Sequence, residues 1–167
     1  FKTGNYISKN TIVIDPVIDW STYLGGSEYD DIRDTKIGKD GYVYIVGSTN
    51  STSNIATTGA HLSTFQGGNN SSGADAFIAK FASNGTCVWS TYYGGAAVDI
   101  GISLAFDTAG YLFVAGRTNS TTGIATPGSH QPTKAGNISG YDAFLLKMDT
   151  SGTPVWSTYF GGNFNEG

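Results

Sequence analysis

The sequence predicts an all-β protein built from a repeated unit of four antiparallel strands. The motif Trp-Ser-Thr-Tyr-x-Gly-Gly occurs at residues 20–26, 89–95 and 156–162, so its copies start 69 and 67 residues apart. Glycine accounts for 24 of the 167 residues, and the rest of the chain is rich in β-branched and aromatic residues. These residues favour strands and turns over helices. Repetition at a nearly fixed spacing is typical of repeat architectures.

Each full repeat contains four segments with the composition of a strand. The segments between the tryptophan motifs also match, because residues 41–47 align with 110–116 and residues 75–80 align with 142–147. We therefore expect four strands in each repeat, at 32–37, 42–48, 76–81 and 88–93 and at 101–106, 111–117, 143–148 and 155–160.

Glycine-containing turns separate these expected strands. Residues 38–41 and 107–110 join the first strand to the second, and Asn84-Gly85 and Ser151-Gly152 join the third to the fourth. Such sequences favour tight hairpins because glycine accepts a positive φ. The link between the second and third strands is longer, polar and glycine-rich, which predicts a surface loop.

A repeated four-stranded antiparallel unit predicts the blade of a β-propeller, with a solenoid as the alternative. The chain is then a β-propeller fragment, and residues 18–24 are expected to be the strand that closes the ring, with partners beyond residue 167. The expected organisation is a lead-in from an upstream region, an orphan outer strand, two four-stranded blades and the start of a further blade, at 1–17, 18–26, 27–95, 96–162 and 163–167.

These motifs, in this order, resemble the SBBP family of bacterial β-propeller repeats from about residue 15 to the end of the chain. The resemblance implies a ring of about seven blades, of which this chain supplies about two. Its loop motif Asn-Ser-Thr…Ile-Ala-Thr…His is similar to versions in the Bacteroidetes, which implies an exported surface protein and type 9 secretion. Asp34 and Lys36 depart from the pattern, since the second repeat has Ser103 and Ala105 there. The first strand is therefore expected to be exposed or to face an interface.

The composition excludes several classes of function. Nine Lys and Arg against thirteen Asp and Glu give a net charge of −4, which leaves no basic stripe for nucleic acid. No apolar stretch is long enough to predict a membrane-spanning segment. The single cysteine, Cys87, rules out an intramolecular disulfide and is expected to be a small buried hydrophobe.

Most candidate chemical residues recur with the repeat, which favours structural roles. His61 and His130 occupy equivalent loop positions, and no nucleophile with an orienting carboxylate recurs beside them. A loop residue set by the repeat is therefore favoured over a metal ligand or a general base. Four aspartates beside turns are expected to cap backbone N–H groups, with calcium binding as the alternative: Asp30, Asp75, Asp99 and Asp142.

Aromatic residues and one threonine are the candidates for contacts with other molecules. The tryptophan of the repeated motif is expected to pack between blades rather than stack on a sugar. Tyr93, Phe65 and Phe164 vary between repeats and are candidates for exposed contacts. Asp107-Thr108-Ala109 resembles the Asp-Ser/Thr-aliphatic pattern of O-glycosylation in exported Bacteroidetes proteins, which implies Thr108 as a candidate O-glycosylation site.

We expect no catalytic residue, metal or cofactor in this chain. The expected role is a non-catalytic scaffold in a large exported bacterial surface protein, for adhesion or for docking on a protein or glycan partner through loops. The remaining blades of the same polypeptide are expected partners too, and the expected location is extracellular or on the outer cell surface. The alternatives are the propeller part of a secreted carbohydrate-active enzyme with catalytic residues elsewhere, and a cargo or structural subunit bound to secretion or gliding-motility machinery.

Overall fold

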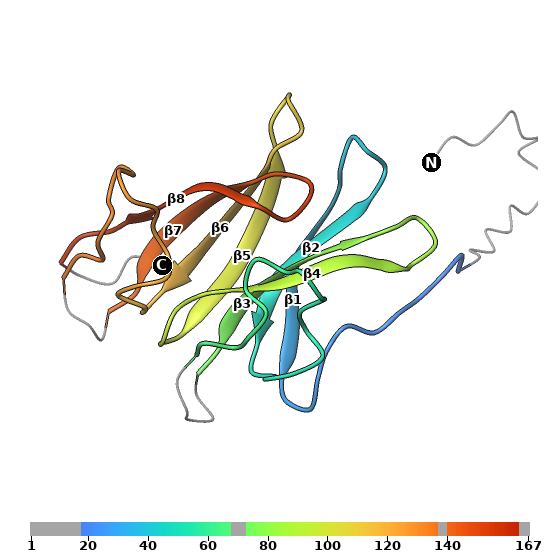
Figure 1. Ribbon diagram of the computed structural model, residues 1–167, viewed down its shortest axis with the longest axis horizontal. Coiled ribbons are helices and arrows are strands. Elements are labelled where there is room, and N and C mark those ends of the chain that lie inside the picture. The colour runs from blue at the N-terminus through green and yellow to red at the C-terminus, as the bar shows by residue number, and fades with distance from the viewer. Residues whose placement is uncertain (1–17, 68–72, 137–139, 164–167) are drawn as a thin grey trace, which may run out of the picture.

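Two four-stranded antiparallel sheets lie side by side in the computed structural model, which describes residues 18–67, 73–136 and 140–163 (Figure 1). The first sheet has the order β1 (Asp30–Ile37), β2 (Val43–Thr49), β3 (Asp75–Phe81) and β4 (Cys87–Tyr93). The second repeats this order with β5 (Asp99–Phe106), β6 (Leu112–Thr118), β7 (Asp142–Met148) and β8 (Pro154–Phe160).

The all-β prediction is confirmed, and each sheet has the topology of a propeller blade. Across the described ranges no helix is long and apolar enough to cross a membrane. The predicted lead-in at 1–17 and nearly all of the predicted start of a further blade at 163–167 lie outside the described residues.

The strand ends differ from the prediction by one or two residues, with a local cause at the start of each sheet. β1 begins at Asp30 and β5 at Asp99, both two residues earlier than predicted. Asp30 faces Thr49 across the ladder and its carboxylate accepts a hydrogen bond from the Thr49 hydroxyl. A side-chain contact thus extends the strand onto a residue that has little intrinsic preference for it.

Tight turns at glycine close the hairpins, as the sequence predicts. Gly85 has a φ of +82° and Gly152 a φ of +90° in the turns between the third and fourth strands of the two sheets. Gly41 and Gly110 have φ values of +78° and +92° in the turns between the first and second strands. The surroundings of these glycines differ between the two kinds of turn. An added Cβ would meet open space at Gly41 and Gly110, whereas it would meet a tryptophan ring at Gly85 and Gly152.

The long loops lie along the outer strands of the sheets. The backbone N–H of Thr57 donates to the Ser90 carbonyl at 2.9 Å, and the N–H of Tyr92 donates to the Leu62 carbonyl at 3.1 Å. The second sheet repeats this pattern through Thr126 N–Ser157 O at 3.0 Å and Tyr159 N–Gln131 O at 3.1 Å. The loop therefore hydrogen-bonds to strand edges that would otherwise be open to pairing with other chains.

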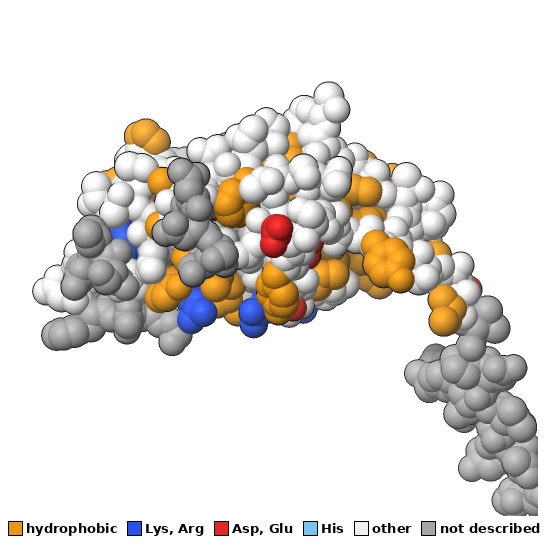
Figure 2. All heavy atoms as spheres, turned by 90° about the horizontal axis from the view of Figure 1, so that it is seen from below, with side chains coloured by type: hydrophobic (Ala, Val, Ile, Leu, Met, Phe, Trp, Pro, Cys, Tyr) orange, Lys and Arg blue, Asp and Glu red, His pale blue; other side chains and the backbone are white. Residues whose placement is uncertain are grey.

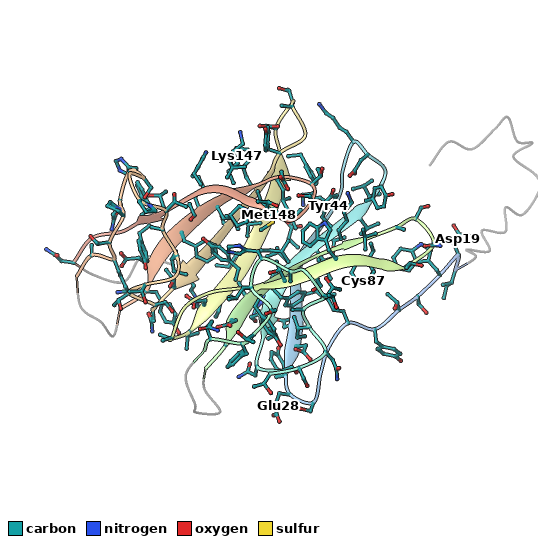
Figure 3. All side chains as sticks on the ribbon, in the orientation of Figure 1. Asp19, Glu28, Tyr44, Cys87, Lys147 and Met148 are labelled. Atoms are coloured by element: carbon teal, nitrogen blue, oxygen red, sulfur yellow. The ribbon has the colours of Figure 1, made fainter. Side chains whose placement is uncertain are left out.

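The main apolar core lies between the two sheets. Tyr44, Val46 and Ile78 of the first sheet pack with Phe144 and Met148 of the second in one buried cluster. Tyr44 and Met148 lie between the two sheets in Figure 3. Burial of this shared surface joins the sheets into one body, because the removal of apolar area from water is the main favourable contribution.

Glycine permits the closest approach between the sheets. A Cβ at Gly101 of β5 would stand 2.4 Å from Cγ2 of Val46 on β2 and 3.1 Å from the carbonyl oxygen of Gly47. The equivalent residue of β1 is Ile32, which is 53% exposed. The two first strands therefore present different surfaces to whatever lies before them.

The two sheets differ in burial although their third strands have nearly the same sequence. Every residue of β3 is buried, whereas buried and partly buried residues alternate along β7. A second cluster, built on Ile45, Phe77 and Tyr92, covers the other face of the first sheet. The first sheet is thus packed on both faces and the second on one.

Residues 18–26 lie beside the first sheet without joining a ladder. Trp20 packs on the Gly85 turn, where an added Cβ would come within 2.7 Å of its ring. Tyr23 is 101% exposed, whereas the equivalent Tyr92 is 1% exposed. As the fourth strand of a blade, this segment would have to pair with a third strand that has a free edge. In the described chain the third strands, β3 and β7, already pair with β4 and β8. Its expected role as a closing strand therefore stays a prediction.

Candidate functional site

A groove opens where the hairpin turns of the two sheets meet. It has a volume of about 460 Å³ and is bordered by the turn after β1, the turn after β5 and the turn after β7. Its walls carry two carboxylates, two aromatic rings and one ammonium group, together with small residues. These groups belong to Asp40, Asp149, Tyr111, Phe106 and Lys39.

Asp40 connects the groove to the core. Its carboxylate accepts hydrogen bonds from the Lys80 ammonium at 2.9 Å and from the Tyr44 hydroxyl at 2.7 Å. Desolvation raises the pKa of Asp40, but these bonds and one from the Tyr42 N–H outweigh it and hold the pKa below its ordinary value. The group is therefore an anion at neutral pH.

Asp149 provides the second fixed anion of the groove. Its Oδ1 accepts hydrogen bonds from the Ser151 N–H at 2.8 Å and from the Thr153 N–H at 3.0 Å. Desolvation raises the pKa of Asp149, yet the bonds from Ser151 and Thr153 leave it below the ordinary value. Both carboxylates are hydrogen-bond acceptors held in place by the turns that carry them.

Tyr111 provides the aromatic wall of the groove and is 36% exposed. The Lys147 ammonium lies 3.9 Å from its ring centroid and fixes one side of the ring. Figure 3 places Lys147 at the hairpin end of the second sheet. Fixed acceptors beside an aromatic ring are able to bind a neutral polar ligand that has hydroxyl groups and an apolar face.

The aspartates that begin β1 and β5 cap backbone groups, as the capping interpretation predicts. Asp30 accepts the Gly26 N–H at 2.9 Å, and Asp99 accepts the Gly95 N–H at 2.7 Å. Asp99 also accepts the Ser120 hydroxyl at 2.7 Å. Burial, only partly offset by hydrogen bonds from Thr118, Gly95 and Ser120, raises its pKa to about 6.

The aspartates that begin β3 and β7 have different neighbours. Asp75 accepts the Gln66 N–H at 2.6 Å, and burial raises its pKa to about 7. Asp142 accepts the Ala135 N–H at 2.9 Å and has the Lys134 ammonium 3.7 Å away. The first repeat has Phe65 at the position equivalent to Lys134, so the ammonium group found beside Asp142 has no equivalent beside Asp75. Within the described ranges, no three or more His, Cys, Asp or Glu side chains are grouped to hold a metal ion.

The two histidines occupy equivalent positions in space, as they do in the sequence. His61 lies 6.4 Å from the ring of Tyr93, and His130 lies 6.4 Å from the ring of Phe160. Desolvation lowers the pKa of His61. Both rings therefore pack against the last residue of an outer strand, in line with the interpretation as repeat-determined loop residues.

Thr108 lies exposed in the turn after β5, beside the groove. Its carbonyl accepts a hydrogen bond from the Lys39 ammonium at 2.7 Å, which ties this turn to the turn after β1. Attachment of a sugar to Thr108 stays a prediction.

The tryptophan prediction is confirmed at Trp89, but one aromatic prediction is wrong. The Trp89 indole donates to the Thr150 carbonyl of the second sheet at 3.1 Å, so this residue packs between blades. Tyr93 is 2% exposed and donates to the Ile124 carbonyl at 2.7 Å, because the second sheet covers it. Phe65 is partly buried with its ring against Tyr92, and Phe164 lies outside the described residues.

Asp34 does face an interface, as its departure from the repeat suggests. Its carboxylate accepts hydrogen bonds from the Leu104 N–H of the second sheet at 2.9 Å and from the Lys36 ammonium at 2.7 Å.

The groove was not predicted from the sequence. Its carboxylates do not recur, since Ala109 aligns with Asp40 and Ala82 aligns with Asp149.

One comparison with known proteins bears on the fold. Residues 88–124 match the family model of the SBBP β-propeller repeat. This segment contains all of β4 but its first residue, together with β5 and β6, so the match includes the junction between the two sheets. The two sheets are β-propeller blades. No curated protein matches the chain.

Proposed function

We propose that the chain is a non-catalytic β-propeller scaffold that binds a glycan in the groove between its two blades. The observation that supports this most directly is the combination of Tyr111 with the two held carboxylates of Asp40 and Asp149. Carboxylates accept hydrogen bonds from sugar hydroxyls, and an aromatic ring packs against the apolar face of a sugar.

We further propose that the protein lies on the outside of a bacterial cell and functions there in adhesion or in docking on a partner. The resemblance of the repeats to exported bacterial proteins supports this location. The held geometry of the groove suits binding, since its carboxylates are already hydrogen-bonded and lose little freedom when a ligand arrives.

A glycan array with the 167-residue chain tests the proposal. We expect binding to at least one neutral glycan and a loss of about tenfold or more with Tyr111→Ala. Tyr42→Ala is the matched control, because Tyr42 makes the same contact with a lysine, at 4.1 Å from Lys80, but does not border the groove. Equal losses in both variants, or binding only to a protein partner, would contradict the glycan proposal.

A further inference from the structure

The turn between β3 and β4 contains Asn84-Gly85, which is the only Asn-Gly pair in the sequence. Asn84 is exposed to solvent. A glycine after an asparagine leaves the peptide nitrogen unshielded and the backbone free to rotate, so that this nitrogen is able to attack the side-chain amide. The pair is therefore a candidate for covalent modification.

The side chain of Asn84 holds this turn in the way that a carboxylate holds the equivalent turn. The Thr86 N–H donates to Oδ1 of Asn84 at 3.1 Å, whereas the equivalent Thr153 N–H donates to Asp149 at 3.0 Å. The first blade has Ala82 at the position of Asp149. The bond from Thr86 also polarises the amide carbonyl and stabilises negative charge on Oδ1 when a nucleophile adds to Cγ.

Two contacts keep the nucleophile engaged while the turn is closed. The Gly85 N–H donates to the Ala82 carbonyl at 2.9 Å, in a turn where Gly85 has a φ of +82°. The Trp20 ring covers Gly85 so closely that an added Cβ would stand 2.7 Å from it. The Gly85 nitrogen is thus free to react only when the turn opens, and Trp20 opposes this opening.

Residues 18–26, which carry Trp20, have few other attachments to the first blade. They join no ladder, and Ile18 and Tyr23 are 80% and 101% exposed. Figure 2 shows hydrophobic side chains exposed at the end of the molecule where the described residues begin. Asp19 lies beside the hairpin of β3 and β4 in Figure 3. The contact between Trp20 and Gly85 is therefore important for keeping this segment in place.

We propose that Asn84 is a site of spontaneous deamidation, and that its conversion to isoaspartate releases residues 18–26 from the first blade. The Gly85 nitrogen adds to Cγ of Asn84, the bond from Cγ to Nδ2 breaks, and ammonia leaves with the proton of the Gly85 N–H. Water then opens the cyclic imide at either of its two carbonyls, which yields aspartate or isoaspartate. The reaction consumes water and releases ammonia, and no electrons are transferred.

The two products have different effects on the turn. Aspartate keeps Oδ1 as the acceptor of the Thr86 N–H and leaves the backbone unchanged. In isoaspartate the backbone runs through Cβ and Cγ, so the turn gains one backbone carbon and a new carboxylate. Gly85 is then displaced from the Trp20 ring, and the acceptor of the Thr86 N–H becomes part of the main chain. Only isoaspartate is expected to release the segment.

The second blade lacks this reaction, because Ser151 stands at the position of Asn84. The contact of Gly152 with Trp89 between the blades is therefore unaffected, and the modification acts at one end of the pair of blades. The inference does not depend on glycan binding, since the groove is bordered by the turns after β1, β5 and β7.

Incubation of the 167-residue chain at mildly alkaline pH tests the proposal. Ion-exchange chromatography separates the products by their added negative charge, and peptide mass spectrometry identifies aspartate and isoaspartate at residue 84. The indole signal of Trp20, assigned with Trp20→Phe, is then compared between fractions by NMR. We expect it to move to the position of a hydrated indole in the isoaspartate fraction alone, while the Trp89 signal stays in place.

Two pairs of variants connect the reaction to the structure. Asn84→Ser copies the second blade and is expected to abolish both products without moving the Trp20 signal. Trp20→Ala is expected to speed deamidation about fivefold or more, because the turn opens more often. Trp156→Ala is its matched control and should keep the wild-type rate, since Trp156 lies against no hairpin glycine in the described ranges.

Three results would overturn the proposal. The first is a folded chain that stays unmodified at residue 84 under conditions that convert the urea-unfolded chain. The second is an equal rate in Trp20→Ala and Trp156→Ala, which would remove Trp20 from control of the turn. The third is an isoaspartate fraction in which the Trp20 signal does not move, which would show that the segment stays attached.

Discussion

Gly152 of the second blade lies against the indole ring of Trp89 in the first, so that an added Cβ would stand 3.1 Å from the ring. Gly85 has the same relationship to Trp20, with a corresponding distance of 2.7 Å. The contact is a repeated element of the fold rather than an isolated one. It links the tryptophan of one motif to the hairpin glycine of the following repeat.

Alanine at Gly152 is expected to destabilise the protein more than alanine at Gly110. Both residues have a φ near +90°, so both variants carry a similar backbone cost of about 1 kcal/mol. Gly152→Ala also crowds the indole, which adds about 1–3 kcal/mol. Urea unfolding measures both. Equal losses in the free energy of unfolding would show that the tryptophan contact contributes nothing.

Alanine at Gly85 is expected to release residues 18–26 from the first blade. The Trp20 fluorescence maximum should shift to longer wavelength as the ring becomes hydrated, beyond any change in Gly41→Ala. Gly41 is the control because it has a similar φ and open space around it. An unshifted Trp20 emission would mean that the segment is held by other contacts.

The stability of the protein is expected to fall as the pH rises through the range from about 4 to 7. Burial raises the pKa of Asp75 to about 7 and that of Asp99 to about 6, above the ordinary value of 3.8. The folded state therefore binds more protons than the unfolded state in this range, and the free energy of unfolding decreases as these protons are lost.

Asp75→Asn is expected to flatten this decline, because the amide oxygen still accepts the Gln66 N–H and no charge forms in the buried site. The gain at pH 7.5 is on the order of a few kcal/mol. Urea unfolding at pH 4.5, 6 and 7.5 measures it. Asp19→Asn, at an exposed carboxyl, serves as the control and should keep the wild-type slope. A slope unchanged by Asp75→Asn would assign the pH dependence to other groups.

Methionine at Lys80 is expected to cost more stability than methionine at Lys147. Both ammonium groups lie over a tyrosine ring and pair with an aspartate, but only Lys80 also donates to the other blade, at Thr150. Loss of that bond and of the Asp40 pair costs on the order of 1–3 kcal/mol. Thermal and urea unfolding of both variants compare the two. A Lys147 variant that is the less stable would contradict a role of Lys80 in joining the blades.

The strands, turns and aspartate caps could be predicted from the sequence because the repeat shows each of them twice. The burial of individual residues could not. The strands β3 and β7 carry almost the same motif, yet only β3 is buried throughout, because a neighbour covers its second face. The prediction that Tyr93 is exposed was wrong for the same reason, because the burial of this residue depends on the repeat that follows it.

The groove could not be predicted from repetition at all. Asp40 and Asp149 each occur in a single repeat, so a search for recurring residues passes over them. Lys80, the partner of Asp40, does recur, as Lys147, at the end of the Asp-Ala-Phe segment. A lysine in an otherwise apolar strand is a signal that an acid stands nearby, since a buried ammonium group needs one.

The difference between Gly101 and Ile32 makes the two ends of this pair of blades chemically unequal. In the observed junction, Val46 of the first blade lies against Gly101 of β5, which has no side chain. A preceding unit that packed on β1 in the same way would bring its residue equivalent to Val46 against the side chain of Ile32. Such a neighbour must carry a smaller residue there. The second blade carries such a residue, Ala115, at the Val46 position, so the surface in front of β1 is complementary to a unit of the second blade's type and not to one of the first's.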